Sequence, residues 1–454
     1  MQEFNIPGEI TEFFHEDTGQ LLLIKGESGT GKTTFALEVL KELCGNSLGA
    51  HIFVRLDKEE IYQNFPKIQK PEFKDKILIF DKSHNVSDAN KFEKEFKSQV
   101  EKNKISIMVI DTIDAMIERY ENPNRIMKEL IEIIKETKVN TLLVQEQESD
   151  GYVDYLVEGI ISLKKSELDG RRVRYITLDK LRGVEIRQPR YLVTLQNGYF
   201  RSFKPFDPNY PARKSFPNAL KRIKNKDQTY STGITDLDAI LDGGFKKGSY
   251  NVIEVDDNVS SQEYLAIIRA IILNFLAQDL GVISVLSGGN HPEAIRNDFT
   301  RFIDKKQFDK YMRITDYFNS ESKNNYIMAL GVNREEALKI LSNTISHLRG
   351  KENKPILNFT GLDTLEYLRG EAIAIKELLT GVGTIKVSND VGLGLIKPGL
   401  KLTQSIKNMA DTYLKIIDID RCCCIYGEKP QTPIYAVTPD DTKNILGIEL
   451  TPLV

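Results

Sequence analysis

The stretch GQLLLIKGESGTGKTTFALEVLKEL, Gly19–Leu43, contains an apolar run, a glycine-rich loop and a helical pattern in that order. The run Leu21–Ile24 is typical of a buried strand, and it leads into Gly26–Thr33, which matches G-x-x-x-x-G-K-[ST]. Glycines let such a loop turn its backbone N–H groups toward phosphate, and the helix that follows adds the positive end of its dipole. The stretch therefore predicts a nucleotide-binding α/β domain.

Each residue type in this loop has an expected role toward a nucleotide and its magnesium ion. Lys32 would reach the outer phosphates, and the hydroxyl of Thr33 would face Mg²⁺. The pattern thus predicts ATP and Mg²⁺ as ligands. We expect the loop contacts to come from Glu27, Ser28, Gly29, Thr30, Gly31, Lys32, Thr33 and Thr34.

Three more apolar runs end at polar residues suited to the same site. HIFVRL is followed by Asp57, ISIMVID ends in Asp111, and TLLV leads into Gln145. A carboxylate at the carboxyl end of a strand can hold the water shell of Mg²⁺, which assigns Asp111 to the metal together with Thr33. Because helical stretches alternate with these runs, we expect a mostly parallel, twisted sheet with helices on both faces.

The second half of the chain repeats this plan without the ligand-binding residues. After STGITDLDAILDGGFKKGS, Ser231–Ser249, the segment IEVDDNVSSQE contains neither glycine nor lysine. Aligning Gly19 with Gly248 places Gly26, Gly29, Gly31, Lys32 and Thr33 opposite Val255, Asn258, Ser260, Ser261 and Gln262. We therefore expect a domain that keeps the fold and lacks the phosphate loop.

Charge and metal ligation point the same way. Asp256 and Asp257 lie in the degenerate loop, where a carboxylate about 5 Å from a phosphate charge costs roughly 3 kcal/mol at an effective dielectric near 20. In the later run PILNFTGLDTL, Thr360 stands where Asp111 stands in the first half. The metal carboxylate is thus lost as well, and the two losses are independent.

Composition and length fit a soluble protein of several domains. The chain has 454 residues, of which 41% are hydrophobic and 28% charged, and it contains no run of 18 apolar residues. Its start, MQEFNIPGEI, lacks the basic and apolar regions of a signal peptide, so we expect a cytoplasmic protein without membrane insertion. Its cysteines, Cys44 and Cys422–Cys424, suit a reducing compartment and favour packing over a metal or redox role.

Net charge is unevenly distributed along the chain. Residues 171–226 hold 15 Lys and Arg against three acids, or +12, which leaves −15 for the remainder of a chain whose net charge is −3. Such a band, from Arg171 to Lys226, can attract a nucleic acid, face an acidic neighbouring subunit, or be a solvated surface and linker. We predict an ATP-binding domain at 1–204, a basic, proline-containing linker at 205–228, and a degenerate domain at 229–454.

The chain resembles the KaiC and RadA branch of the RecA-type ATPases. Ser231–Ser249 is similar to the entry motif of that branch, and VDYLVEGIISLKKSELDGRRVRYITLDKLRG, Val153–Gly183, is similar to its closing hairpin. With the P-loop and the Asp111 strand, the resemblance covers nearly the whole chain as a tandem pair. IPGEITEFF, Ile6–Phe14, in front of the P-loop is more similar to the archaeal gas-vesicle regulator family GvpD.

The resemblance implies further site residues and an assembly. In this branch the Lys and Arg of a K-x-R-G turn reach the terminal phosphate of the adjacent subunit, and KLRG places them at Lys180 and Arg182. The resemblance therefore implies a homo-oligomer with ATP sites between subunits, either a ring, of which a hexamer is one form, or a filament. The alternative is that Lys180 and Arg182 belong to a basic hairpin that contacts no neighbouring subunit. Paired glutamates after the second strand are frequent in KaiC-like proteins, whereas this chain has Asp57 and Lys58 there. Asp57 could orient water, and Lys58 cannot act as a base while charged.

Three functions fit these observations. The leading hypothesis is a regulatory ATPase that converts ATP to ADP and phosphate slowly, with the second domain as a scaffold or surface for a regulatory protein partner. A second is a RadA-like DNA-binding ATPase, although QEQESDGYVD after the fourth strand holds four acids and no Lys or Arg. A third is an adaptor that uses ATP as a structural ligand.

Overall fold

The computed structural model describes residues 5–16, 19–81, 89–117, 123–146, 153–207, 222–288, 290–317, 321–331, 334–439 and 447–454. They divide into two compact units: Met1–Lys204 with Pro452–Val454, and Pro205–Thr451. The segment 205–228 falls in the second unit, and most of it, 208–221, lies outside the described residues, so its assignment as a linker stays a prediction.

The first unit is built on a nine-stranded sheet in the order β3-β2-β4-β5-β1-β6-β7-β8-β9. The strands from β3 to β6 run parallel, and β7 to β9 continue the sheet antiparallel. The strands are β1 (Leu21–Lys25), β2 (Leu48–Phe53), β3 (Ile77–Asp81), β4 (Ile105–Asp111), β5 (Asn140–Val144), β6 (Gly159–Leu168), β7 (Arg171–Leu181), β8 (Arg190–Thr194) and β9 (Arg201–Ser202).

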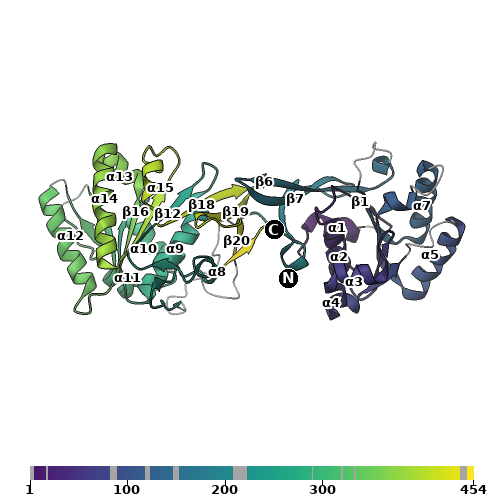
Figure 1. The fold of residues 1–454 in the computed structure, drawn as a ribbon, viewed down its shortest axis with the longest axis horizontal. Coiled ribbons are helices and arrows are strands. Elements are labelled where there is room, and N and C mark those ends of the chain that lie inside the picture. Colours follow the sequence, from purple (N-terminus) through teal and green to yellow (C-terminus); the bar gives the residue numbers. More distant parts are fainter. Residues whose placement is uncertain are drawn as a thin grey trace. The chain divides into compact units, whose positions relative to one another are not determined.

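Helices cover both faces of this sheet (Figure 1). One buried apolar cluster joins α1 and α2 to the sheet and includes Phe35 and Leu40, and another joins α6 and α7 to the opposite face and includes Met127. The helices are α1 (Gly8–Glu16), α2 (Lys32–Leu43), α3 (Lys58–Asn64), α4 (Pro71–Lys74), α5 (Ala89–Asn103), α6 (Ile113–Ile117) and α7 (Pro123–Thr137).

The second unit repeats this strand order and adds one strand, β15, at the edge next to β14. Its ten-stranded sheet runs β15-β14-β13-β16-β17-β12-β18-β19-β20-β21, so β12 occupies the place of β1, and β16 that of β4. Its strands are β12 (Ser249–Val255), β13 (Gly281–Val285), β14 (Met312–Asp316), β15 (Ile327–Ala329), β16 (Ile356–Gly361), β17 (Val391–Ile396), β18 (Thr412–Ile419), β19 (Cys422–Lys429), β20 (Tyr435–Pro439) and β21 (Ile448–Pro452), and a separate two-stranded sheet pairs β10 (Thr229–Tyr230) with β11 (Phe245–Lys246).

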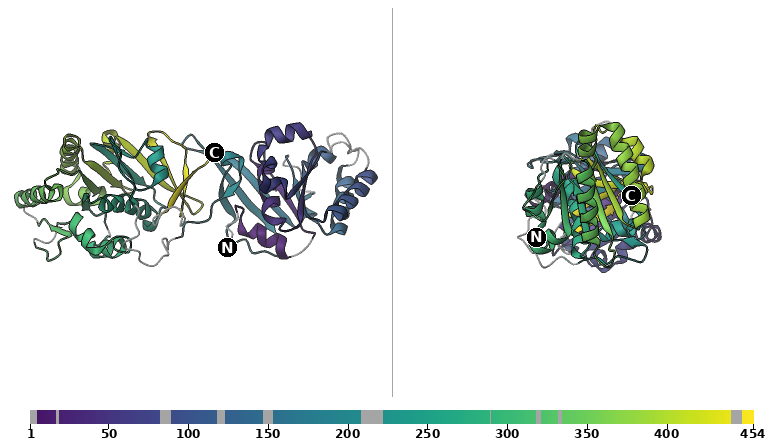
Figure 2. Two further views of the ribbon diagram at one scale, coloured as in Figure 1. Left: turned by 90° about the horizontal axis from the view of Figure 1, so that it is seen from below. Right: turned by 90° about the vertical axis from the view of Figure 1, so that its left-hand side faces the viewer.

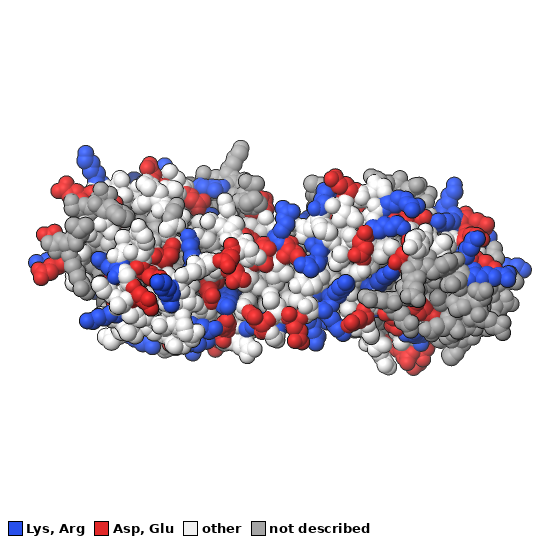
Figure 3. Space-filling view, turned by 90° about the horizontal axis from the view of Figure 1, so that it is seen from above, with Lys and Arg blue, Asp and Glu red and all other residues white. Residues whose placement is uncertain are grey.

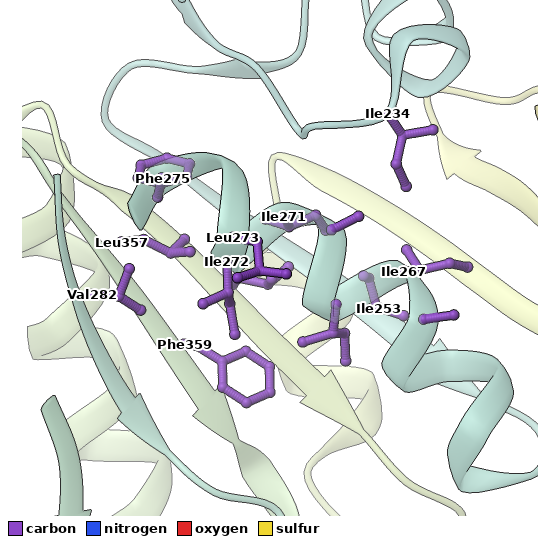
Figure 4. Close-up of a cluster of buried hydrophobic side chains, with 14 of the residues drawn as sticks. Ile234, Ile253, Ile267, Ile271, Ile272, Leu273, Phe275, Val282, Leu357 and Phe359 are labelled. Carbon is purple, nitrogen blue, oxygen red and sulfur yellow. The ribbon is translucent and has the colours of Figure 1, made fainter. Parts of the chain in front are cut away.

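Helices again lie on both faces of this second sheet, as the two views in Figure 2 show. The largest cluster packs Ile267, Ile271 and Phe275 of α9 against Ile253 and Phe359 of the sheet (Figure 4). The helices are α8 (Thr235–Ile240), α9 (Ser261–Ala277), α10 (Pro292–Phe299), α11 (Lys305–Tyr311), α12 (Arg334–Arg349), α13 (Leu362–Arg369), α14 (Glu371–Ser388) and α15 (Thr403–Met409). The predicted fold class is confirmed: both halves are α/β, with mostly parallel sheets flanked by helices.

Candidate functional site: the phosphate loop and the carboxyl edge of the first sheet

The glycine-rich loop joins β1 to α2, as the sequence predicts for a phosphate loop. Gly31 precedes the helix in a left-handed conformation with φ 101°, and no side chain caps the helix start. A Cβ at Gly26, where φ is 149°, would come within 2.4 Å of the carbonyl oxygen of Leu163. Glycine is therefore required at both positions, and the first N–H groups of α2 are left to bind a phosphate.

Lys32 lies across the loop and occupies part of the space that an anion would fill. Its Nζ donates hydrogen bonds to the carbonyl oxygens of Gly26, at 2.5 Å, and Glu27, at 2.8 Å. Burial lowers the pKa of Lys32, whereas the carboxylates of Glu146 and Asp111 act in the opposite direction. A phosphate would replace the two carbonyl contacts with a charge-assisted interaction, which is stronger.

The predicted metal pair is close enough to act as one site. Thr33 Oγ1, in the first turn of α2, donates to Asp111 Oδ2 at 2.7 Å, which brings two oxygen atoms suited to a hard cation together at the carboxyl end of β4. This donor set fits the coordination preference of Mg²⁺, which commonly keeps several waters and uses few protein oxygens. Residues Thr33 and Asp111 would hold the ion; it would screen phosphate charge.

His51 adds a contact to Asp111 that the sequence analysis missed. Its Nε2 lies 3.4 Å from Asp111 Oδ2, its ring stacks on Phe53 at a centroid distance of 4.0 Å, and its side chain is completely buried. This contact restricts the orientation of the Asp111 carboxylate. The available signal was a polar residue at an interior position of an apolar strand.

Gln145 is buried at the end of β5, next to the loop after β4. Its Nε2 lies 3.4 Å from Asp114 Oδ1, and the backbone N–H of Glu146 donates to Asp114 Oδ2 at 2.6 Å. The backbone N–H of Gln145 itself bonds the carbonyl of Ile24 on β1. Asp114 therefore joins the ends of β4 and β5, and Gln145 is held at the sheet edge that carries Asp111.

Asp57 is used locally, as a helix cap. Its Oδ1 accepts from the backbone N–H groups of Glu59 and Glu60, each at 2.9 Å, and Glu60 returns a bond to the Asp57 N–H. This capping box fixes the start of α3. Glu59 and Glu60 lie in the first turn of α3, and a water-orienting role for Asp57 stays a prediction.

The two cations of the K-x-R-G turn differ in their surroundings. Lys180 Nζ donates to the carbonyl oxygens of Asp154, at 3.0 Å, and Val157, at 2.7 Å, so it fastens a turn of its own chain. Arg182 is exposed, and its guanidinium contacts no partner among the described residues. Arg182 is thus available to another molecule, whereas Lys180 would first have to leave two carbonyls.

A cavity of about 580 Å³ adjoins the loop on the side of β6 and β7. Gly26, Glu27 and Thr30 line one wall, and Ser162 and Lys165 line the facing wall. Lys165 Nζ reaches the carbonyl of Ser28 at 3.3 Å across it.

The second unit fills the same helix start with its own side chains. At the start of α9, Ser260 Oγ accepts from the N–H of Glu263 at 3.4 Å, and Glu263 Oε2 accepts from the N–H of Ser260 at 2.6 Å. Asn258 Nδ2 bonds the carbonyl of Asp418 and ties the loop to β18. The carboxylate of Glu263 therefore takes the place that a phosphate would need.

The predicted basic band is only partly described, because residues 208–221 lie outside the description. Within the described part, Arg187 pairs with Glu12 at 2.5 Å, and the guanidinium of Arg190 lies 4.8 Å from the ring centroid of Tyr175. On the face drawn in Figure 3, Lys and Arg are interspersed with Asp and Glu. Among the described residues, no helix is long and apolar enough to cross a membrane.

Comparison with known proteins finds similarity in both halves of the chain. The family model "ATPase: KaiC" matches residues 16–200, and the model "GvpD basic region 2" matches residues 219–347. Residues 16–200 are thus similar to KaiC-like ATPase domains.

The similarity to GvpD extends over almost all of both chains. Protein GvpD2 and Protein GvpD1 of Halobacterium salinarum are each 24% identical to this chain, and each match covers 99% of it and 96% of the relative. The circadian clock oscillator protein KaiC of Thermosynechococcus vestitus is 23% identical over 51% of this chain and 47% of its own. A solved KaiC-like protein from Pyrococcus horikoshii OT3 is 23% identical, with a TM-score of 0.38, and covers 44% of this chain and 98% of that one.

Proposed function

We propose that this protein is a regulatory ATPase that binds one Mg²⁺–ATP in its first unit and hydrolyses it slowly, and that its second unit is a scaffold without nucleotide. The observation that carries the proposal is the contrast between two helix starts. The start of α2 is uncapped beside Lys32 and the Thr33–Asp111 pair, and the start of α9 is closed by Ser260 and Glu263.

Slow turnover follows from the surroundings of the predicted catalytic groups. The Asp57 carboxylate already accepts two backbone hydrogen bonds that fix the start of α3, so its orientation is set by the helix and not by a water molecule. Gln145 is fixed next to Asp114 and can sense occupancy at the strand edge. We propose that the conformation of this site differs between the nucleotide-free and the nucleotide-bound loop, and that a protein partner responds to this difference.

Assembly is the second part of the proposal. Arg182 is exposed, and its guanidinium contacts none of the described residues. An arginine in this position can complete the ATP site of an adjacent subunit. Lys180 would have the smaller part, because two carbonyls of its own chain hold it. We therefore propose a homo-oligomer, a ring or filament, whose ATP sites lie between subunits.

Nucleic-acid binding has less support. Arg187 is neutralised by Glu12, and charges of both signs alternate on the drawn face. The acidic loop after Gln145 lies mostly in 147–152, outside the described residues. DNA binding therefore stays an alternative, to be tested by salt-dependent retention of single strands.

Calorimetry on the intact chain with ATP and Mg²⁺ tests the binding proposal. One nucleotide per chain is expected, and two per chain, or none, would overturn it.

The native mass of the protein, measured with and without Mg²⁺–ATP, tests whether nucleotide binding is linked to oligomer formation. Arg182→Ala should reduce nucleotide-linked oligomers, whereas Arg172→Ala, an exposed arginine on the same hairpin, should leave them unchanged. Equal effects of the two variants would contradict an intersubunit role for Arg182.

A further inference from the structure

The second unit has a cavity of about 850 Å³ at the carboxyl ends of β13, β14 and β16. Its wall includes Leu286 and Ser287 after β13, Tyr317 after β14, and Asp363 and Tyr367 on α13. The volume lies within the range of about 300–1,000 Å³ that small-molecule sites have. The carboxyl ends of strands are also where open α/β sheets bind ligands. The cavity is formed by residues other than those of the degenerate phosphate loop.

The charges on the wall exclude a phosphate and favour a cation. Asp316, Glu321 and Asp363 line the cavity, whereas no Lys or Arg is among its described lining residues. The nearby Lys397 Nζ donates to the carbonyl of Gly288 and lies 4.0 Å from Asp363 Oδ2, so it offsets one of the three carboxylates. Glu321, which is exposed, keeps the wall acidic after that pairing.

Asp363 is held rigidly in the wall. Its Oδ2 accepts from Ser287 Oγ and from the backbone N–H of Gly288, both at 2.8 Å. Its Oδ1 is buried and has no hydrogen-bond partner among the described residues. This oxygen lies inside the wall, out of reach of a ligand in the cavity, so Asp363 would act on a ligand through its charge.

Aromatic rings complete the recognition surface. The Tyr367 side chain is 87% exposed at the rim, an unusual position for a large ring, and Tyr317 is half-buried further in. The Tyr317 ring already accepts one cation, since the guanidinium of Arg369 lies 5.5 Å from its centroid. Tyrosine faces beside carboxylates are the usual means of holding an organic cation.

We propose that this cavity binds a small organic cation, an amine or guanidinium compound, between the carboxylates of Asp363 and Glu321 and the ring of Tyr367. The ligand charge is attracted by both carboxylates, its N–H groups donate to Glu321, and its carbon chain covers the apolar wall. The second unit would then respond to a ligand of its own, which binds at a different place from the nucleotide.

Calorimetry of the full chain without nucleotide tests the proposal, with putrescine and agmatine as probes and 1,4-butanediol as the uncharged counterpart of putrescine. Saturable binding of at least one of the two amines and none of the diol are expected. Tyr367→Ala should weaken that binding about 3- to 10-fold, and Glu321→Gln by a few-fold, less so at high salt. Absence of saturable amine binding, or equal binding of the diol, would overturn the proposal.

Two further variants make the result specific to the cavity. Asp363→Asn should weaken amine binding about tenfold or more; if it fails to fold, the two exposed positions Glu321 and Tyr367 decide. Asp257→Asn, an exposed acid in the degenerate loop, should change nothing. Weakening by Asp257→Asn equal to that by Glu321→Gln would show diffuse attraction to an acidic surface and refute the cavity. The nucleotide stoichiometry is measured separately, so either proposal can fail alone.

Discussion

Helices α2 and α9 follow equivalent strands, yet their first turns are finished in opposite ways. At α2 a left-handed glycine precedes the helix and no side chain caps it, whereas at α9 Ser260 and Glu263 cap each other. A helix start with free N–H groups is unfavourable until a partner arrives. Under the proposed function, a phosphate site is a helix start left unsatisfied, and the second unit lacks one because the start of α9 is satisfied internally.

The cores of the two units explain why the second fold survives this loss. The apolar residues of α9 pack on β12 and its neighbours, just as those of α2 pack on β1, and the loop before α9 adds the partly buried Val259. Because the loop contributes little buried apolar area, its residues can change while the sheet persists. The ligand site and the fold are thus separable in this chain.

Removal of the P-loop lysine tests the comparison most severely. Lys32→Ala should weaken ATP binding about 100-fold or more, because the charge on the outer phosphates loses its partner. Competition with a fluorescent nucleotide measures the affinity. Ser261→Ala, at the equivalent position of α9, is the matched control and should leave ATP affinity unchanged. An equal loss in both variants would mean that the second unit binds nucleotide after all.

A buried acid on α2 is replaced by an isoleucine at the equivalent position of α9. Glu38 is completely buried where α9 has Ile267, and Lys67, only 5% exposed, lies near it between the rings of Phe73 and Tyr199. Burial lowers the pKa of Lys67 to about 8, against 10.5 in the unfolded chain, and the Glu38 charge only partly offsets this.

Lys67→Met should therefore stabilise the first unit, by on the order of 2 kcal/mol at pH 7. Between about pH 8 and 10.5 the unfolded chain binds a proton that native Lys67 does not, so the free energy of unfolding rises with pH there and is flat below. Urea unfolding at pH 7 and pH 10 measures this. The gain from Lys67→Met should shrink at pH 10; a gain that is equal at both values would show that charge burial is not its cause.

Substitution of Asp111, one of the two predicted Mg²⁺ ligands, should have a smaller effect on ATP affinity than Lys32→Ala. Asp111→Asn should weaken Mg²⁺–ATP binding about tenfold and leave metal-free ATP affinity nearly unchanged, since it removes a charge that acts through the ion. Affinity measured with Mg²⁺ and with a chelator separates the two. Thr360→Val, at the corresponding strand end of the second unit, should change neither. An equal loss with and without Mg²⁺ would contradict the metal role.

The sequence predicted the fold class because the P-loop, the apolar strand runs and their order all depend on local patterns. It also placed Thr33 and Asp111 together, since parallel strands end at one edge. The capture of Lys180 by two carbonyls could not be foreseen, because those carbonyls belong to a turn brought near by the sheet. The contact of His51 with Asp111 also depends on the pairing of β2 with β4.

Removal of the side-chain cap of α9 should have the smallest effect on stability. It tests most directly why the starts of α2 and α9 differ. Ser260→Ala removes the acceptor for the Glu263 N–H and should destabilise the second unit by about 1 kcal/mol. Hydrogen exchange of amides in the first turn of α9, together with thermal unfolding, measures this. The freed N–H groups should still not bind ATP, because Asp256 and Asp257 remain and no lysine is present. The variant Ser260→Ala/Glu263→Ala should behave in the same way. If either variant took up a second ATP, the internal cap alone would be what separates the two units, and the acidic loop would have no part in excluding the nucleotide.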